Sequence, residues 1–127
     1  MLAKDPKSKV FAPLADSYRK MGMLKEALEV AKEGIEHHPK LVGGRVALSR
    51  ILGEIGSLDQ AIAQAEYAMS LSPENVLAHH LKAEFLLRKK QPKEALKTYK
   101  RLLFLIPDDD RAQRAIKKLE TFIISSY

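Results

Sequence analysis

Two pairs of adjacent histidines are the side chains of this 127-residue chain that are best suited to bind a metal ion: His37–His38 and His79–His80. Two ligands on a helix share one face when they are three or four residues apart. Adjacent residues instead point about 100° away from each other. Neither pair can therefore chelate a metal ion through a shared face, and we expect no metal site at either pair.

A run of three carboxylates at residues 108–110 is the second candidate. Asp108, Asp109 and Asp110 together could hold a hard cation through their oxygens. Aspartate is also a favoured N-cap residue, and negative charge stabilises the positive end of a helix dipole. An apolar spacing typical of a helix follows the run, so we favour the N-cap interpretation.

The sequence holds no set of residues that matches a known catalytic arrangement. It has no cysteine, which excludes disulfides, thiol catalysis and zinc sites of the cysteine type. It also has no serine elbow, phosphate-binding loop or dinucleotide glycine motif. Gly43 and Gly44 lie between two expected helices, where they indicate a turn or a close packing point. We expect a non-enzymatic protein that needs no cofactor.

The positions of four prolines show how the chain is organised. Pro6, Pro39, Pro73 and Pro107 recur at nearly equal intervals, and they divide the chain into repeats at about 8–41, 42–75 and 76–109. Other residues keep this register, since Ala27, Ala61 and Ala95 recur at the same interval. A fixed period of this length is typical of stacked supersecondary repeats.

Each unit resembles a tetratricopeptide repeat, which is a helix–turn–helix of about 34 residues. The first unit carries the family's residue types in full, namely Phe11, Leu14, Ala15, Tyr18, Gly22, Ala27 and Pro39. The second has Arg45 at the aromatic position, and the third has His79 there and Lys90 for the turn glycine. The resemblance implies an all-α fold, an α-solenoid in which three repeats form a right-handed superhelix. It also implies one domain over 1–127, closed by a capping helix at about 109–124.

Apolar periodicity predicts where the helices lie. We expect them at about 24–37, 42–54, 58–70, 75–89 and 93–104, besides the first and the capping helix. Ser57 and Gln60 have the spacing of a capping box, and Pro92 suits a first helical turn. Pro13 leaves two alternatives open: a bent entry with a regular helix from about Ala12, or a helix that begins near Phe11 with Pro13 in its first turn.

Charge and hydropathy limit the partners and the location of the protein. The formal net charge is +6, which favours an acidic partner. The longest apolar run, 102–106, is far too short to span a membrane. The chain starts without the apolar stretch of a signal peptide, so we expect a cytoplasmic protein that does not insert into membranes.

The family resemblance implies that the first helix of each repeat lines a concave groove that binds a partner protein. By that resemblance we expect the partner-binding residues to be Lys9, Asp16, Arg19, Val46, Arg50, Leu77, His80, Leu81, Glu84 and Arg114. Arg19 and Arg50 have planar donors that suit a carboxylate. For single residues the alternative stays open that Leu81 and Leu87 belong to the core and that both arginines are merely solvated.

The carboxylate clamp of co-chaperone members of the family is absent. By the same resemblance, its lysine, asparagine and arginine positions hold Ala12, Asp16, Ala47, Leu77 and Leu81 here. The sequence therefore gives no support for binding of a chaperone tail.

We expect an adaptor that binds a peptide or helix of a partner protein, acidic or amphipathic, in a bacterial motility, secretion or regulatory assembly. The first alternative is a self-associating scaffold subunit or homo-oligomer, because Phe104, Phe122, Ile123 and Tyr127 are apolar at positions expected to be exposed. The second is a nucleic-acid-binding helical repeat. Few aromatic residues are available for base stacking, so we expect no nucleic acid partner.

Overall fold

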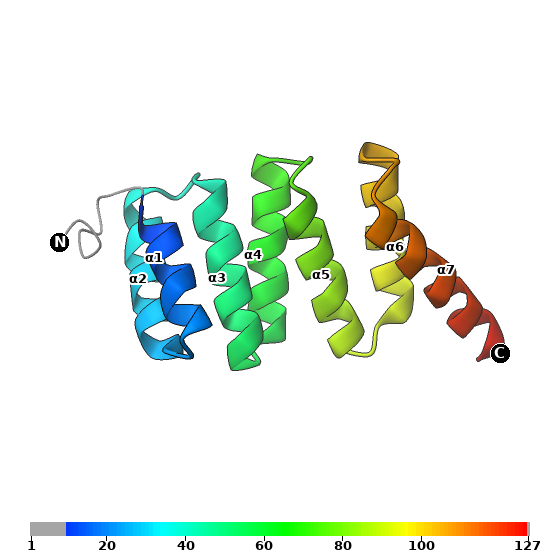
Figure 1. Ribbon diagram of the computed structural model, residues 1–127, viewed down its shortest axis with the longest axis horizontal. Coiled ribbons are helices and arrows are strands. Elements are labelled where there is room, and N and C mark those ends of the chain that lie inside the picture. Colours follow the sequence, from blue (N-terminus) through cyan, green and yellow to red (C-terminus); the bar gives the residue numbers. More distant parts are fainter. Residues whose placement is uncertain (1–9, 127) are drawn as a thin grey trace.

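Seven helices form the structure of residues 10–126, which are the residues that the computed structural model describes (Figure 1). They are α1 (Phe11–Lys20), α2 (Leu24–His37), α3 (Val42–Ile55), α4 (Leu58–Leu71), α5 (Val76–Arg88), α6 (Pro92–Leu105) and α7 (Asp110–Ser125). No strand occurs within 10–126. The all-α class is confirmed. Pro6, Lys9 and Tyr127, which the sequence analysis used, lie outside the described residues.

The helices stack in chain order, each against the next one (Figure 1). In addition, α1 contacts α3 and α3 contacts α5. These three are the first helices of the three repeats, so they lie next to one another along one side of the stack. We call this side, formed by α1, α3 and α5, the first-helix face. The arrangement is the α-solenoid that the repeat period predicts.

The turn inside each repeat contains one residue with a positive φ. These residues are Gly22 with φ 77°, Gly56 with φ 99° and Lys90 with φ 61°. Glycine adopts this left-handed conformation readily, whereas other residues are strained there by roughly 1–2 kcal/mol. Lys90 is therefore a strained residue at a place where the first two repeats have glycine.

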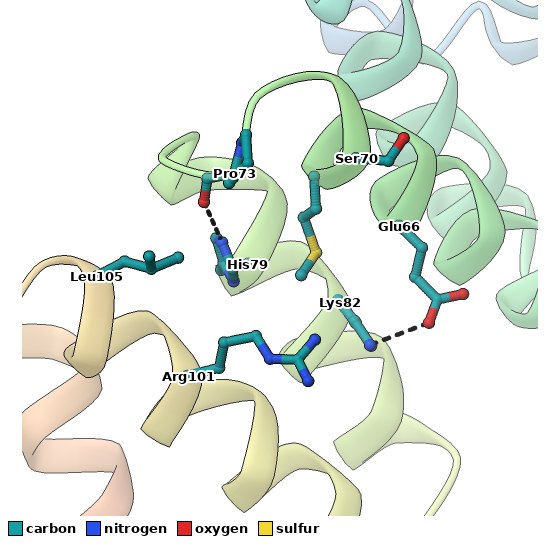
Figure 2. A pocket seen from close by; sticks show the side chains of 8 residues that line it. Glu66, Ser70, Pro73, His79, Lys82, Arg101 and Leu105 are labelled. Carbon is teal, nitrogen blue, oxygen red and sulfur yellow. Dashed lines mark hydrogen bonds and ion pairs between the residues drawn. The ribbon is translucent and has the colours of Figure 1, made fainter.

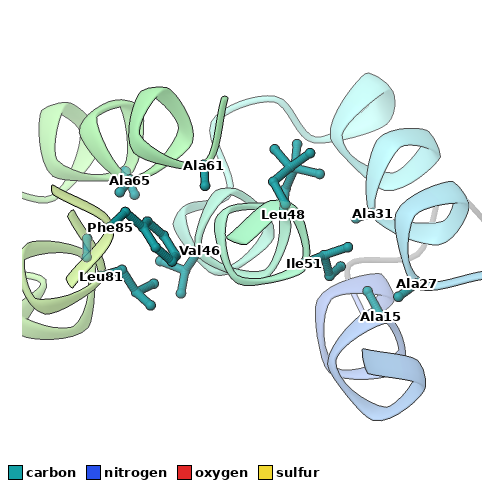
Figure 3. Packing of buried hydrophobic residues seen from close by; sticks show 13 residues of the cluster. Ala15, Ala27, Ala31, Val46, Leu48, Ile51, Ala61, Ala65, Leu81 and Phe85 are labelled. Atoms are coloured by element: carbon teal, nitrogen blue, oxygen red, sulfur yellow. The ribbon is translucent and has the colours of Figure 1, made fainter. Parts of the chain in front are cut away.

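Fully buried alanines allow the helices to approach closely. Those that are 0 % exposed are Ala15, Ala27, Ala31, Ala61, Ala65, Ala68, Ala78, Ala83, Ala95 and Ala112. Larger side chains fill the remaining space, and Figure 3 shows Ile51 of α3 directed toward α1 and α2. Buried alanines thus recur in both core clusters, where their small side chains allow close packing of neighbouring helices.

Two buried phenylalanines pack directly on helix glycines. A Cβ atom added to Gly34 would lie 2.0 Å from the ring of Phe11, and one added to Gly44 would lie 2.5 Å from the same ring. A Cβ atom on Gly53 would lie 2.4 Å from the ring of Phe85. Gly44 is therefore a close packing point rather than a turn, and Phe85 fills the space that Gly53 leaves.

The helix ends decide between the alternatives for Pro13. Because α1 begins at Phe11, Pro13 lies in the first turn, where its missing N–H costs no helical hydrogen bond. Pro92 is the first residue of α6, as expected. None of the helices within 10–126 is long and apolar enough to cross a bilayer.

The N-caps show one correct and one wrong prediction. Asp109 caps α7, since its Oδ1 accepts a hydrogen bond from the backbone N–H of Ala112 at 2.8 Å. Ser57 is the N-cap residue of α4, but its side chain makes no capping hydrogen bond, so the predicted capping box is wrong. The reason is local geometry. Ser57 has ψ 69°, whereas Asp109 has the extended ψ of 102° that directs an N-cap side chain at the helix.

Candidate partner-binding site

Charged side chains connect α1 to α3 across the first-helix face. The Nε atom of Arg19 donates to Asp16 at 2.9 Å, and a second nitrogen of the same guanidinium donates to Glu54. Asp16 also pairs with Lys20 at 3.3 Å. The Arg50 guanidinium is 3.9 Å from Asp16, at the limit of an ion pair. Arg19 is therefore engaged within the chain, whereas the one ionic partner of Arg50 among the described residues is distant.

The same charged neighbours shift the pKa values of Asp16 and Arg19. Partial burial raises the pKa of Asp16, but Arg19, Lys20 and Arg50 together hold that pKa below its usual value. Burial lowers the pKa of Arg19, but Glu54 and Asp16 more than offset this and raise it. Both groups are thus held in their charged forms at neutral pH.

A second set of polar contacts connects α5 to α7. The Nε2 atom of His80 lies 3.2 Å from Oδ1 and 3.3 Å from Oδ2 of Asp109, the residue that caps α7. Glu84 of α5 is 4.0 Å from Arg111 of α7. These contacts attach the capping helix to the first helix of the third repeat, so α7 continues the series of α1, α3 and α5.

The structure places the predicted partner-binding residues in different environments. Val46, Leu81 and His80 are buried, and the first two belong to the main core cluster. Arg19 and Asp16 are mostly covered by their own ion pairs. The side chains that remain accessible are Arg50, Leu77, Glu84 and Arg114.

The structure shows which of these single residues belong to the core, which are accessible and which are paired within the chain. Leu81 is a core residue at 7 % exposure, whereas Leu87 is 39 % exposed. The Arg19 side chain is only 11 % exposed, so it is an internally paired group and not a solvated one. Sequence reasoning did not identify Glu54 as its partner. The repeat spacing could have indicated this pair, because Gly53 is the residue one repeat after Arg19 and Glu54 is its neighbour in the sequence.

A cleft of about 280 Å³ lies between α4, α5 and α6 (Figure 2). In its wall, His79 is 1 % exposed and its Nε2 atom lies 2.7 Å from the carbonyl oxygen of Pro73. Because a carbonyl only accepts, Nε2 carries the hydrogen. The Nδ1 atom then has no hydrogen-bond partner among the described residues. Lys82 pairs with Glu66 at 3.0 Å across the cleft.

His79 is kept neutral by its surroundings. Burial lowers its pKa, and the positive charges of Lys82 and Arg101 lower it further, whereas the hydrogen bond with Pro73 raises it. The charged residues that line the cleft are the cations Lys82 and Arg101 and the carboxylate of Glu66. Within 10–126 no three histidine, aspartate or glutamate side chains gather closely enough to hold a metal ion. His79 is buried at the position that Phe11 occupies in the first repeat.

We expect the substitution His79→Phe to reduce the pH dependence of stability between about pH 7.5 and 5. An unfolded histidine takes up a proton near pH 6.5, whereas folded His79 does so only at lower pH. The free energy of unfolding must then fall as the pH drops through that range. Urea denaturation at several pH values measures the slope. The exposed Phe104→Ala variant is the control, and parallel curves for His79→Phe and the parent would contradict the prediction.

Residues 10–126 thus define a class: an α-solenoid of helix–turn–helix repeats whose first helices share one face and whose last helix caps the stack. A tetratricopeptide repeat family model matches residues 54–119, more than half of the chain. The chain belongs to the tetratricopeptide repeat family. No curated protein matches the sequence.

Solved structures of the same fold extend over nearly the whole chain. The first tetratricopeptide repeat domain of Spaghetti (RPAP3), bound to an HSP90 peptide, has a TM-score of 0.81 and 19 % identity and covers 91 % of this chain and 94 % of its own. The Yersinia enterocolitica type III secretion chaperone SycD, in complex with a peptide of the translocator YopD, has a TM-score of 0.80 and 18 % identity, with 87 % and 90 % covered. The TPR2B domain of yeast Sti1, in a complex with Hsp70, has a TM-score of 0.77 and 20 % identity, with 87 % and 94 % covered. At these identities the likeness shows the shared fold.

Proposed function

We propose that this protein is a non-enzymatic interaction module that binds a segment of a partner protein along its first-helix face. Tetratricopeptide repeat structures of the same fold have been solved with peptides from HSP90 and from the translocator YopD. Those complexes support a peptide or helix as the kind of ligand. The motility, secretion or regulatory setting and the cytoplasmic location stay predictions from the sequence.

The availability of Arg50 is the observation that carries this proposal. Its side chain is 34 % exposed on α3, in the middle of the first-helix face, and the one ion pair it forms with residues 10–126 is to Asp16, at a long 3.9 Å. A guanidinium in this position can turn toward a carboxylate of a bound segment and form two parallel hydrogen bonds. The accessible Leu77 of α5 provides apolar surface on the same face.

The partner we propose is an acidic or amphipathic segment other than a chaperone tail. Asp16 occupies one of the clamp positions, and it would repel a terminal carboxylate at that point. Ala47 and Leu81, at two further clamp positions, are buried apolar residues that offer no donor. The peptide of the RPAP3 complex therefore serves as a guide to the binding mode and not to the ligand.

Charge reversal on α3 tests the proposal. The tagged protein is isolated from its native cell with its partners, next to Arg50→Glu and the matched variant Lys32→Glu, which makes the same charge change on the exposed surface of α2. We expect Arg50→Glu to weaken the partner's affinity by about tenfold or more, because it places like charges in contact. Lys32→Glu should retain the partner. Equal retention by both variants would overturn the assignment of the first-helix face.

Self-association is a second candidate, favoured by the exposure of Phe104 on α6 and of Ile124 on α7. These side chains are 85 % and 73 % exposed, so each offers a large apolar side chain that a second copy could cover. Light scattering over a range of concentrations and salt tests this. A dimer that resists salt and is lost in Phe104→Ser would support it, and a clean monomer throughout would dismiss it.

A further inference from the structure

An apolar pocket of about 460 Å³ lies at one end of the array, between the last turn of α5, the start of α6 and the last turns of α7. It is lined by Leu87, Lys90, Pro92, Leu119 and Phe122. In Figure 1 the turn from α5 to α6 and the carboxyl end of α7 both lie at the lower end of the molecule. The volume falls within the range of about 300–1,000 Å³ of ligand pockets, so it has room for more than one side chain.

We propose that this pocket holds an apolar anchor residue of an acidic amphipathic segment of a partner protein. The proposal rests on the proposed function, since it names a subsite for the same partner. Leu87 is on α5, a helix of the first-helix face, so a segment lying along that face reaches the pocket without leaving α5. The first half of α7 has the polar surface expected of a capping helix, whereas Phe122 remains 57 % exposed.

Lys90 supplies the preference for an acidic occupant. Of the five lining residues it alone is charged. It also holds the left-handed turn conformation, with φ 61°, that glycine holds in the other two repeats. A lysine at this position is strained where glycine would not be, and residues with backbone strain of this kind cluster at functional sites. A cation at the rim of an apolar pocket suits a carboxylate next to an apolar side chain.

The charge also argues against a second copy of this chain as the occupant. The chain has a net charge of +6, and its own last helix presents the exposed cation Lys118 one helical turn before Phe122. A second copy that inserted its Phe122 would bring this cation toward Lys90. Like charges in contact are unfavourable. An acidic segment of another protein removes this repulsion.

Two-dimensional NMR of the isotope-labelled full chain tests the proposal. The probe is a synthetic peptide of about four helical turns with leucine every three to four residues and glutamate elsewhere. We expect amide shifts concentrated at Leu87, Lys90, Leu119 and Phe122, and much weaker binding when lysine replaces the glutamates. Absence of shifts at these amides with millimolar peptide would overturn the proposal. So would concentration-dependent shifts at the same amides without peptide, which would indicate a second copy as the occupant.

Two variants separate binding from stability. Lys90→Gly should raise the Tm by roughly 3–5 °C because the strain is removed, yet weaken peptide binding by about threefold to fivefold because the cation is lost. Phe122→Ser should weaken binding by about tenfold or more. Met21→Ser, a comparable change at an exposed apolar residue outside the pocket, should leave affinity unchanged. If Lys90→Gly binds as tightly as the parent, Lys90 has no role in recognition and the acidic preference is wrong.

Retention of the native partner by the variants distinguishes the pocket proposal from the proposed binding along the first-helix face. If Arg50→Glu loses the partner and Phe122→Ser retains it, the first-helix face binds the partner without the pocket, and the subsite is wrong. If both variants retain it, both assignments fail. Loss in both variants, with Met21→Ser unaffected, supports the two together.

Discussion

The substitution Gly53→Ala is expected to destabilise this protein by about 1–3 kcal/mol, although alanine is the better helix former. Gly53 is buried in α3, and a Cβ atom added there would lie 2.4 Å from the ring of Phe85. That ring is 3 % exposed and packs in the core with Val46 and Leu81 (Figure 3). Accommodating the methyl group must therefore displace this buried ring from its place in the core or move α5 away from α3. The free energy of unfolding in urea measures the loss.

The same substitution should have the opposite sign once the ring is gone. Phe85→Ala alone costs about 3–5 kcal/mol, but it opens space for the added Cβ atom. Helix propensity then decides, and Gly53→Ala should stabilise the Phe85→Ala variant by up to about 1 kcal/mol. Gly43→Ala is the matched control in α3, since its nearest contact would be Ala12 Cβ at 3.9 Å. An equal cost of Gly53→Ala in both backgrounds would show that the ring is not the cause.

The substitution Asp109→Ala is expected to cost about 2–4 kcal/mol, from two separate losses. The first is the N-cap of α7, because Oδ1 accepts from Ala112. The second is the partner of His80, whose side chain is only 7 % exposed and would be left buried without its carboxylate. Urea denaturation gives the total, and hydrogen exchange in α7 shows whether the capping helix detaches first.

Two further variants separate these losses. Asp109→Asn keeps an oxygen acceptor for both contacts and should cost clearly less than Asp109→Ala. Asp108→Ala, which removes the exposed neighbouring carboxylate, should change the stability by no more than about 0.5 kcal/mol. A cost for Asp108→Ala equal to that of Asp109→Ala would mean that the general charge of the run, and not these contacts, stabilises α7.

Asp109 also contributes to acid sensitivity. Burial raises its pKa, but the N–H of Ala112 and the side chain of His80 hold the pKa below its usual value. A carboxyl with a lowered folded pKa stabilises fully above its unfolded value of about 3.9, and this contribution is lost as the pH falls through the folded value. The parent should therefore lose more stability than Asp109→Asn below about pH 4.

The repeat period and the local signals of the sequence predicted the fold closely. Regularly spaced prolines and alanines indicated the three helix pairs, and the acidic run 108–110 indicated the start of α7. These features are readable because they act locally. A proline or an N-cap aspartate affects the backbone within one helical turn. The repeat period by itself indicates that each unit packs on its neighbour in the same way. The capping box at Ser57 failed because it depends on one dihedral angle that residue types do not fix.

The availability of each side chain on the first-helix face depended on partners far away in the chain. Arg19 is engaged because Glu54, 35 residues later, reaches it, and His80 is engaged by Asp109, 29 residues later. The space at Gly53 is filled because Phe85 of the next repeat enters it. Such pairings follow from how the repeats are rotated against one another, and composition and spacing do not encode that rotation residue by residue. The sequence therefore established the solenoid, whereas the packing of its helices left Arg50 and the pocket beside Lys90 accessible to a partner.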